Sequence, residues 1–112
     1  MLILQHMLYV KDGHSETPVA VRIYKPALVE SQLWRCQFEI DWPQGITRCS
    51  GAGIDALQAL TLTLQIIGAH IYTSDYHKQG RLRAYEHEAG YGFPITDNLR
   101  DMLIGVDRPQ AP

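Results

Sequence analysis

One segment constrains the fold of this chain more than any other: residues 53 to 73, GIDALQALTLTLQIIGAHIYT, have helical periodicity. Apolar side chains recur at spacings of three and four residues, at Leu57, Leu60, Leu64, Ile67 and Ile71. Such a stripe covers one side of a helix and is buried against another layer. Asp55 with Gln58 has the spacing of a capping box, and Ser50 is a second candidate for the cap. We expect the helix to end near Tyr72.

The opposite side of this helix is more polar, with Thr61, Thr63 and Gln65, but Leu62 and Ile66 interrupt it. Part of the outer side is therefore apolar. Such a patch predicts either cover by a later segment or a surface that contacts another molecule.

Strand patterns precede the helix. In residues 33 to 42, LWRCQFEIDW, apolar and polar residues alternate, so we expect this strand to face the helix with one side. Residues 2–10, 19–24 and 46–50 have weaker strand patterns, and Asp12-Gly13 and Pro43-Gln44-Gly45 are turn signals between them. We expect Ser50-Gly51-Ala52-Gly53 to break the sheet before the helix.

After the helix we expect a polar loop over 74–80, a strand from Arg81 to His87 and an extended segment over 90–95. Thr96 or Asp97 is a candidate cap for a short helix through Leu103. Strands joined by short turns pair antiparallel. The order predicts an α+β fold, in which one long helix packs an antiparallel sheet of four to six strands and a short C-terminal helix follows. Residues 1–105 form one domain, and 106–112 form a flexible tail.

Composition excludes some functions. The chain has 112 residues, a net charge of −2 and scattered basic residues, which argues against a nucleic-acid partner. No apolar run approaches the ~20 residues that span a bilayer, and no leader peptide is visible, so we expect a cytoplasmic protein without a membrane partner. Cys36 and Cys49 are expected to be reduced thiols, although pairing across a hairpin stays open.

The sequence contains no recognisable catalytic, cofactor or metal motif. The five histidines lack zinc-ligand spacing, and no Cys-x-x-Cys occurs. We therefore predict no catalytic residue, no metal ligand and no cofactor. One alternative is a small enzyme whose site assembles around His77, Glu86 and His87, because two glutamates flank His87.

Tyrosine and arginine gather in the second half of the chain, and these residue types are enriched at protein interaction hot spots. Together with the two apolar residues on the outer helix side, they give the candidate contact residues Leu62, Ile66, Asp75, Tyr76, His77, Arg81, Arg83 and Tyr91.

Several segments resemble a family of small, uncharacterised bacterial proteins. They are Gly53–Leu60, its continuation Ile67-Gly68-Ala69, Gly80-Arg81-Leu82, Gly90-Tyr91-Gly92-Phe93-Pro94 and the upstream strand Trp34–Ile40. The resemblance extends to about Ile95, and its motifs are structural. It implies a domain without an assigned activity.

Single-domain bacterial proteins of this size are often immunity proteins, an analogy of class. We expect a protein-binding module, most of all an immunity-type or antitoxin-type protein that neutralises a cognate toxin or effector. Besides the enzyme, a self-associating structural module that uses Leu62 and Ile66 is an alternative, and the chain is expected to be a monomer or a homodimer.

Overall fold

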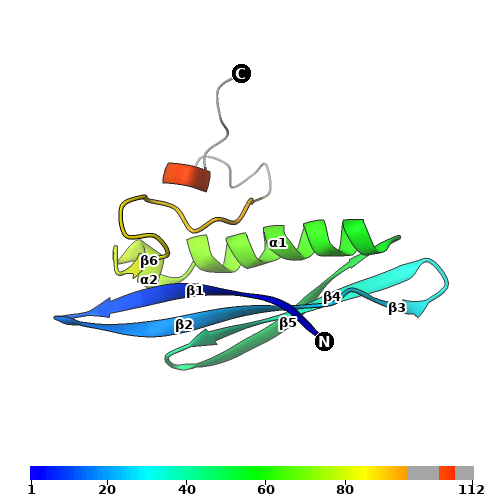
Figure 1. Ribbon diagram of the computed structural model, residues 1–112, viewed down its shortest axis with the longest axis horizontal. Helices are drawn as coiled ribbons and strands as arrows, with labels where there is room; N and C mark the ends of the chain where they lie inside the picture. The colour runs from blue at the N-terminus through cyan, green and yellow to red at the C-terminus, as the bar shows by residue number, and fades with distance from the viewer. Residues whose placement is uncertain (96–103, 108–112) are drawn as a thin grey trace, which may run out of the picture.

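The computed structural model describes residues 1–95 and 104–107, and these form an α+β fold with one helix laid across one antiparallel sheet (Figure 1). The elements are β1 (Leu2–Asp12), β2 (Ser15–Tyr24), β3 (Ala27–Glu30), β4 (Leu33–Trp42), β5 (Gly45–Gly53), α1 (Ala56–Tyr72), α2 (Asp75–Lys78), β6 (Leu82–Arg83) and the 3-10 helix η2 (Gly105–Asp107). The predicted fold class is confirmed. The short helix predicted from Thr96 or Asp97 to Leu103 lies outside the described residues.

The sheet is built from hairpins. β1 pairs with β2, β2 with β4, and β4 with β5 along its whole length, all antiparallel. β2 and β3 lie along one edge of β4 and β5 lies along the other, so β5 is one outer strand of the sheet. At the other side, the short β6 pairs only with Tyr9 and Val10 of β1.

β3 was not predicted. Its four residues follow Pro26 and are all exposed, so they lack the alternation that marks a half-buried strand. Pairing with β4 forms this strand: Ala27 lies opposite Arg35 and Leu28 opposite Trp34.

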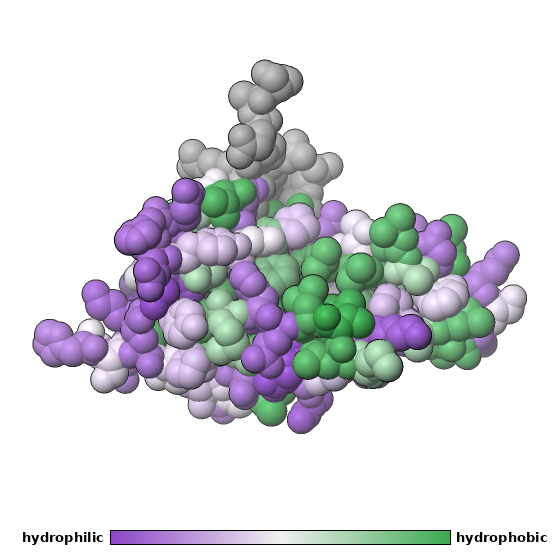
Figure 2. Space-filling view, viewed as in Figure 1, coloured by the Kyte–Doolittle hydropathy of each residue, from purple (hydrophilic) through white to green (hydrophobic). Residues whose placement is uncertain are grey.

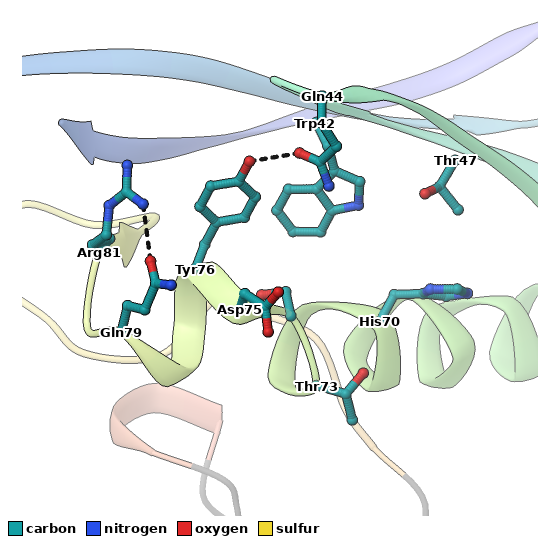
Figure 3. A pocket seen from close by; sticks show the side chains of 10 residues that line it. Trp42, Gln44, Thr47, His70, Thr73, Asp75, Tyr76, Gln79 and Arg81 are labelled. Carbon is teal, nitrogen blue, oxygen red and sulfur yellow. Dashed lines mark hydrogen bonds between the residues drawn. The ribbon is translucent and has the colours of Figure 1, made fainter.

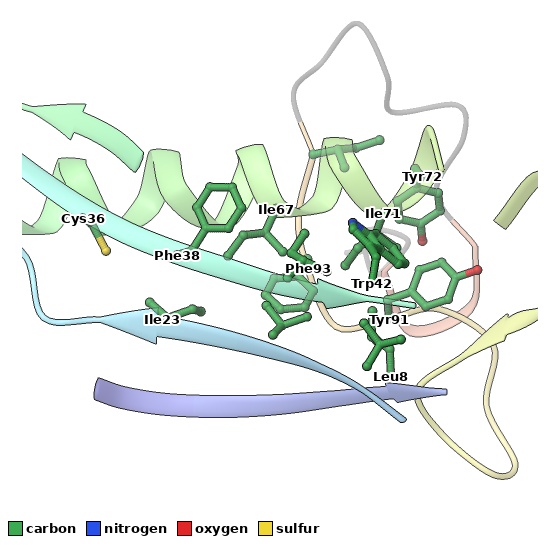
Figure 4. Packing of buried hydrophobic residues seen from close by; sticks show 14 of the residues in the cluster. Leu8, Ile23, Cys36, Phe38, Trp42, Ile67, Ile71, Tyr72, Tyr91 and Phe93 are labelled. Atoms are coloured by element: carbon green, nitrogen blue, oxygen red, sulfur yellow. The ribbon is translucent and has the colours of Figure 1, made fainter. Parts of the chain in front are cut away.

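β4 supplies the centre of the core. Cys36, Phe38, Ile40 and Trp42 are buried on the face towards α1, as the alternation predicted. Figure 4 shows Phe38 and Trp42 among the side chains packed between the strands and the helix. The opposite face of the sheet carries ion pairs such as Arg22–Glu39 and Arg48–Glu39.

Asp55 is the N-cap of α1, and its carboxylate accepts a hydrogen bond of 2.7 Å from the backbone N–H of Gln58. The helix ends at Tyr72, as predicted. The predicted buried stripe is wrong at its start, because Leu57 is 72% exposed. Ala59 is fully buried instead, and a helix turns about 200° between these two positions.

The prediction that Thr63 lies on the polar side of the helix is also wrong. Thr63 is fully buried, and its hydroxyl donates to the carbonyl of Cys36 at 2.9 Å. The same hydroxyl accepts from the backbone N–H of Gly51 at 3.0 Å. The side chain is satisfied on both counts, so its burial does not leave an unpaired polar group.

Residues 50–53 do not break the sheet, contrary to the prediction. They continue β5, and Gly51 lies directly under Thr63. A Cβ added at Gly51 would overlap the Thr63 hydroxyl, and one added at Gly53 would crowd the backbone of Ala59. These glycines therefore let α1 approach β5 closely. The prediction of a strand break rested on the low strand propensity of glycine, which does not take this close approach into account.

The segment from Ala84 to Ile95 runs beside α1 and over β1 (Figure 1): Pro94 lies against Gly68 of the helix, and the Phe93 ring packs on His6 of β1 with centroids 5.3 Å apart. The strand predicted from Arg81 to His87 is limited to Leu82 and Arg83, because the chain then leaves the edge of β1. Tyr91, Phe93 and Ile95 are buried, and His6 Nε2 lies 2.8 Å from the carbonyl oxygen of Tyr91. Within the described residues no helix has the length and apolar character to cross a membrane.

Candidate functional site

A cleft of about 600 Å³ lies between the turn of the β4–β5 hairpin and the corner where α1 meets α2 (Figure 3). β5 leads from that turn to the start of α1, and α1 runs back over the sheet. The helix therefore ends above the turn from which β5 began. The cleft is lined by Trp42, Gln44, Thr47, His70, Thr73, Ser74, Asp75, Tyr76, Gln79 and Arg81.

Tyr76 forms the central wall of the cleft. Its ring stacks on Trp42 with centroids 5.5 Å apart and an interplanar angle of 18°. Its hydroxyl donates to the side-chain oxygen of Gln44 at 2.5 Å. Ser74 caps α2 by accepting from the N–H of His77, and this turn directs Tyr76 towards the sheet. A flat aromatic surface is thereby held by both layers of the fold.

Arg81 closes one end of the cleft. Its guanidinium lies 5.4 Å from the centroid of the Tyr76 ring, and its Nε donates to the carbonyl oxygen of Lys11 at 2.8 Å. A further hydrogen bond of 2.9 Å reaches Gln79. Asp75 also lines the cleft, so the cleft presents both a cationic and an anionic side chain.

A second, apolar groove of about 250 Å³ lies beside the cleft on the outer side of α1. Leu62, Ile66 and Ala69 line it at helical spacing, together with Gln65, His70 and Thr73. His70 and Thr73 line both hollows. The two therefore form one continuous surface, here termed the cleft–groove surface.

Two of the predicted contact residues lie behind this surface. His77 is half-buried, and its Nδ1 is 2.6 Å from the hydroxyl of Tyr91, which is itself 3% exposed. Burial lowers the pKa of His77, so the neutral ring is favoured. Burial, with the Asp107 carboxylate as a weaker cause, raises the pKa of Tyr91 to about 12.

This pair belongs to a buried polar cluster that includes Asp107. The Asp107 carboxylate accepts from the Tyr72 hydroxyl and from the backbone N–H groups of Tyr91 and Gly92. Burial and the hydrogen bond to Asp107 raise the pKa of Tyr72. The cluster holds neutral phenols against a half-buried imidazole, which joins the C-terminal segment to the helix end. Asp107 falls within the range predicted as a tail.

Arg83 lies elsewhere. It pairs with Glu16 through two hydrogen bonds of 2.6 and 2.7 Å, and its guanidinium lies 4.6 Å from the Tyr9 ring. Tyr9 follows the buried Leu8 and so faces the side of the sheet that α1 does not cover. The structure thus brings Leu62, Ile66, Asp75, Tyr76 and Arg81 together and leaves the other three outside the surface.

Sequence reasoning missed seven residues that line the cleft: Trp42, Gln44, Thr47, His70, Thr73, Ser74 and Gln79. A signal was present, because a helix that follows directly after a hairpin strand must return over the hairpin turn. That topological step places the Pro43-Gln44 turn beside the helix end and could have identified them.

The alternative enzyme site is not assembled in this arrangement. Glu86 and His87 have side chains that are 78% and 92% exposed and 3.8 Å apart, whereas His77 is packed between Tyr72 and Tyr91. Among residues 1–95 and 104–107, no three His, Cys, Asp or Glu side chains are grouped so as to hold a metal ion.

Residues 4–95 match the model of a protein family described as "Domain of unknown function (DUF6968)". The match covers most of the chain, so the chain belongs to this family. It confirms the predicted resemblance to a family without an assigned activity, whereas a bacterial origin stays a prediction. No curated protein and no solved structure matches the chain.

Proposed function

We propose that this member of the DUF6968 family is a protein-binding module and that the cleft–groove surface is its contact site. The observation that carries the proposal is the continuity of the two hollows through His70 and Thr73. An apolar groove thereby adjoins an aromatic and charged cleft.

The composition of the surface fits a protein partner. Interface hot spots are enriched in Trp, Tyr and Arg, and they lie beside apolar contacts that exclude water. Trp42, Tyr76 and Arg81 supply the first feature, and Leu62 with Ile66 supplies the second. Both hollows are open to solvent, whereas small-molecule sites enclose most of their ligand.

The surface is also held in place before a partner arrives. Tyr76 is fixed by Trp42 and Gln44, and Arg81 by Lys11 and Gln79. Side chains that are already ordered lose less conformational entropy on binding. This favours tight recognition of one partner over weak contact with many.

Within this class, an immunity-type or antitoxin-type protein of the cytoplasm is the specific role proposed. Such a protein neutralises its effector by occupying the effector's surface. It therefore needs a stable scaffold with one ordered contact site, and the cleft–groove surface on the sheet-and-helix frame supplies both.

The test is binding to the purified product of the gene adjacent to the one that encodes this chain, measured by calorimetry. Tyr76→Ala and Leu62→Ser are each expected to weaken binding about 10- to 30-fold, the effect of losing a hot-spot side chain. Leu57→Ser is the matched control, because Leu57 is on the same helix, 72% exposed and outside the groove. It should change the affinity less than about twofold.

Two results would argue against the proposal. If the adjacent gene product does not bind, the immunity-type role is lost. If it binds and Tyr76→Ala and Leu62→Ser behave like Leu57→Ser, the chain is a binding protein that uses a different surface.

A further inference from the structure

The first strand has a partly unpaired edge. β1 pairs with β2 along its length, but on its other side β6 reaches only Tyr9 and Val10. Among the residues that the structure describes, the backbone from Leu4 to Leu8 has no hydrogen-bond partner on that side. Between Leu2 and Leu4 the pairing with β2 shifts by one residue, so the regular part of the free edge starts at Leu4.

The hairpin fixes which backbone groups point outward. Asp12 and Ser15 flank a two-residue turn, and the residues that flank such a turn bond to each other. The backbone N–H and C=O groups of the even-numbered residues of β1 therefore point towards β2. The N–H of Lys11 instead donates to the carbonyl of Arg81 on the other side, as expected for an odd position. By the same alternation, Gln5 and Met7 present their N–H and C=O groups outward.

The start of β1 also exposes apolar side chains. Met1, Leu2, Ile3 and Leu4 are 88%, 45%, 42% and 45% exposed. Figure 2 shows hydrophobic side chains gathered where the N-terminal end of β1 lies in the matching view of Figure 1. An open strand edge with exposed apolar residues is a template for pairing with another strand.

The charge pattern of β1 indicates which strand can pair with its free edge. No Asp, Glu, Lys or Arg occurs from Met1 to Val10. Like charges placed directly opposite each other destabilise a strand pair, and natural edge strands often carry Lys to prevent pairing. The outer edge of β5 carries Arg48, with a side chain that is 69% exposed, whereas the free edge of β1 has no such barrier. Because this part of β1 carries no such charge, it is complementary to an antiparallel copy of itself that is related by a two-fold axis.

We propose that the free edge of β1 pairs antiparallel with the same edge of a second copy of this chain, which joins two sheets into one. The axis passes near His6, so that the outward groups of Gln5 meet those of Met7 in the second copy, and those of Met7 meet Gln5. The cleft–groove surface is formed by other residues, at the β4–β5 turn and the end of α1, and both copies of it stay open. The inference is independent of the proposed binding function.

The first test is the mass of the purified chain across a concentration series, by light scattering or sedimentation. A rise towards twice the 12.7 kDa of one chain is expected. A mass that stays at one chain at every concentration overturns the proposal, and then a strand from a different protein is the remaining occupant of this edge.

Gln5→Lys and Gln37→Lys form a matched pair of variants. Both glutamines are exposed on the uncovered face of the sheet, but Gln5 is at the free edge and Gln37 is in the interior strand β4. Gln5→Lys should raise the dissociation constant of the dimer about tenfold or more, because like charges then meet near the axis. Gln37→Lys should leave it unchanged. A dimer that both variants leave intact uses another surface and overturns the proposal.

Amide hydrogen exchange tests the pairing without any substitution. The amides of Gln5 and Met7 should exchange at least about tenfold more slowly at concentrations where the dimer forms. The amides of His6 and Leu8, which bond to β2, should be protected at all concentrations. If the exchange of Gln5 and Met7 does not depend on concentration, β1 does not form the interface.

Discussion

The hydroxyl of Tyr72 donates a hydrogen bond of 2.6 Å to the carboxylate of Asp107. The same carboxylate accepts from the backbone N–H groups of Tyr91 and Gly92 at 2.7 and 2.6 Å. One side chain near the end of the described chain therefore holds both the last turn of α1 and the segment that runs beside it.

Asp107→Ala should lower the free energy of unfolding by about 2–3 kcal/mol, because three donors lose a charged acceptor. Urea unfolding at neutral pH measures the effect. Asp41→Ala is the control, since the Asp41 side chain is 48% exposed and its contact with Arg22 is 3.9 Å long, and it should cost less than about 0.5 kcal/mol. Equal losses in the two variants would mean that Asp107 does not anchor the segment.

Gly68→Ala tests the contact of α1 with residues 93–95. Alanine normally stabilises a helix interior by about 1 kcal/mol relative to glycine. A Cβ at this position would overlap the carbonyl oxygen of Pro94, and overpacking costs about 1–3 kcal/mol. We therefore expect a net loss of stability in thermal unfolding, opposite in sign to the propensity effect. Thr61→Ala, at an exposed site of the same helix, should be neutral or slightly stabilising, and a stabilising Gly68→Ala would contradict the close contact.

The two cysteines should react at different rates with a thiol reagent. Cys36 is fully buried, and burial raises the pKa of its thiol, whereas Cys49 is exposed and both are free. We expect one fast-reacting thiol per chain, whereas the second should react only after denaturant has unfolded the protein. Cys49→Ser should remove the fast reaction, and Cys36→Ser should keep it. Two fast thiols in the folded protein would show that the interface between β4 and α1 opens readily.

Glu39 should make the free energy of unfolding depend on pH in the acidic range. Hydrogen bonds from Tyr24, Arg48 and Arg22 lower the pKa of its carboxyl from 4.5 to about 2. Between these two pKa values the folded state binds fewer protons than the unfolded state. The contribution of Glu39 to the free energy of unfolding is therefore complete above pH 4.5 and is lost as the pH falls to about 2.

The melting temperature of Glu39→Gln should therefore fall less steeply than that of the wild type as the pH is lowered through this range. Glu86→Gln, at a side chain that is 78% exposed, is the control and should keep the wild-type slope. Identical slopes in all three proteins would show that the Glu39 network does not bias protonation.

The parts of the fold that were predictable depend on local periodicity. β4 has the two-residue alternation and α1 has the 3.6-residue repeat, so each was found with nearly its observed bounds. Thr63 and Gly51 were misread because their roles arise only when helix and strand meet: the hydroxyl finds its partners on β4 and β5. No pattern within either segment carries that information.

The candidate site was predictable only in part for the same reason. Leu62 and Ile66 stood out as apolar interruptions of a polar helix side, and Tyr76 and Arg81 as residue types common at interfaces. Trp42 and Gln44 come from a hairpin more than 30 positions earlier, and Tyr76 reaches Gln44 across 32 residues. Arg83 was expected at the contact surface together with Arg81, but it lies in β6 and pairs with Glu16 instead.

The contact between His6 and Tyr91 cannot form until the ribosome has made both residues. The two residues are 85 positions apart in the chain. At roughly 5–20 residues per second, the ribosome needs about 4 to 17 s to make the later residue after the earlier one. During that interval the apolar start of β1 has emerged without the segment that packs on it. Fast overexpression should therefore favour association between nascent chains through this strand before any of them is complete.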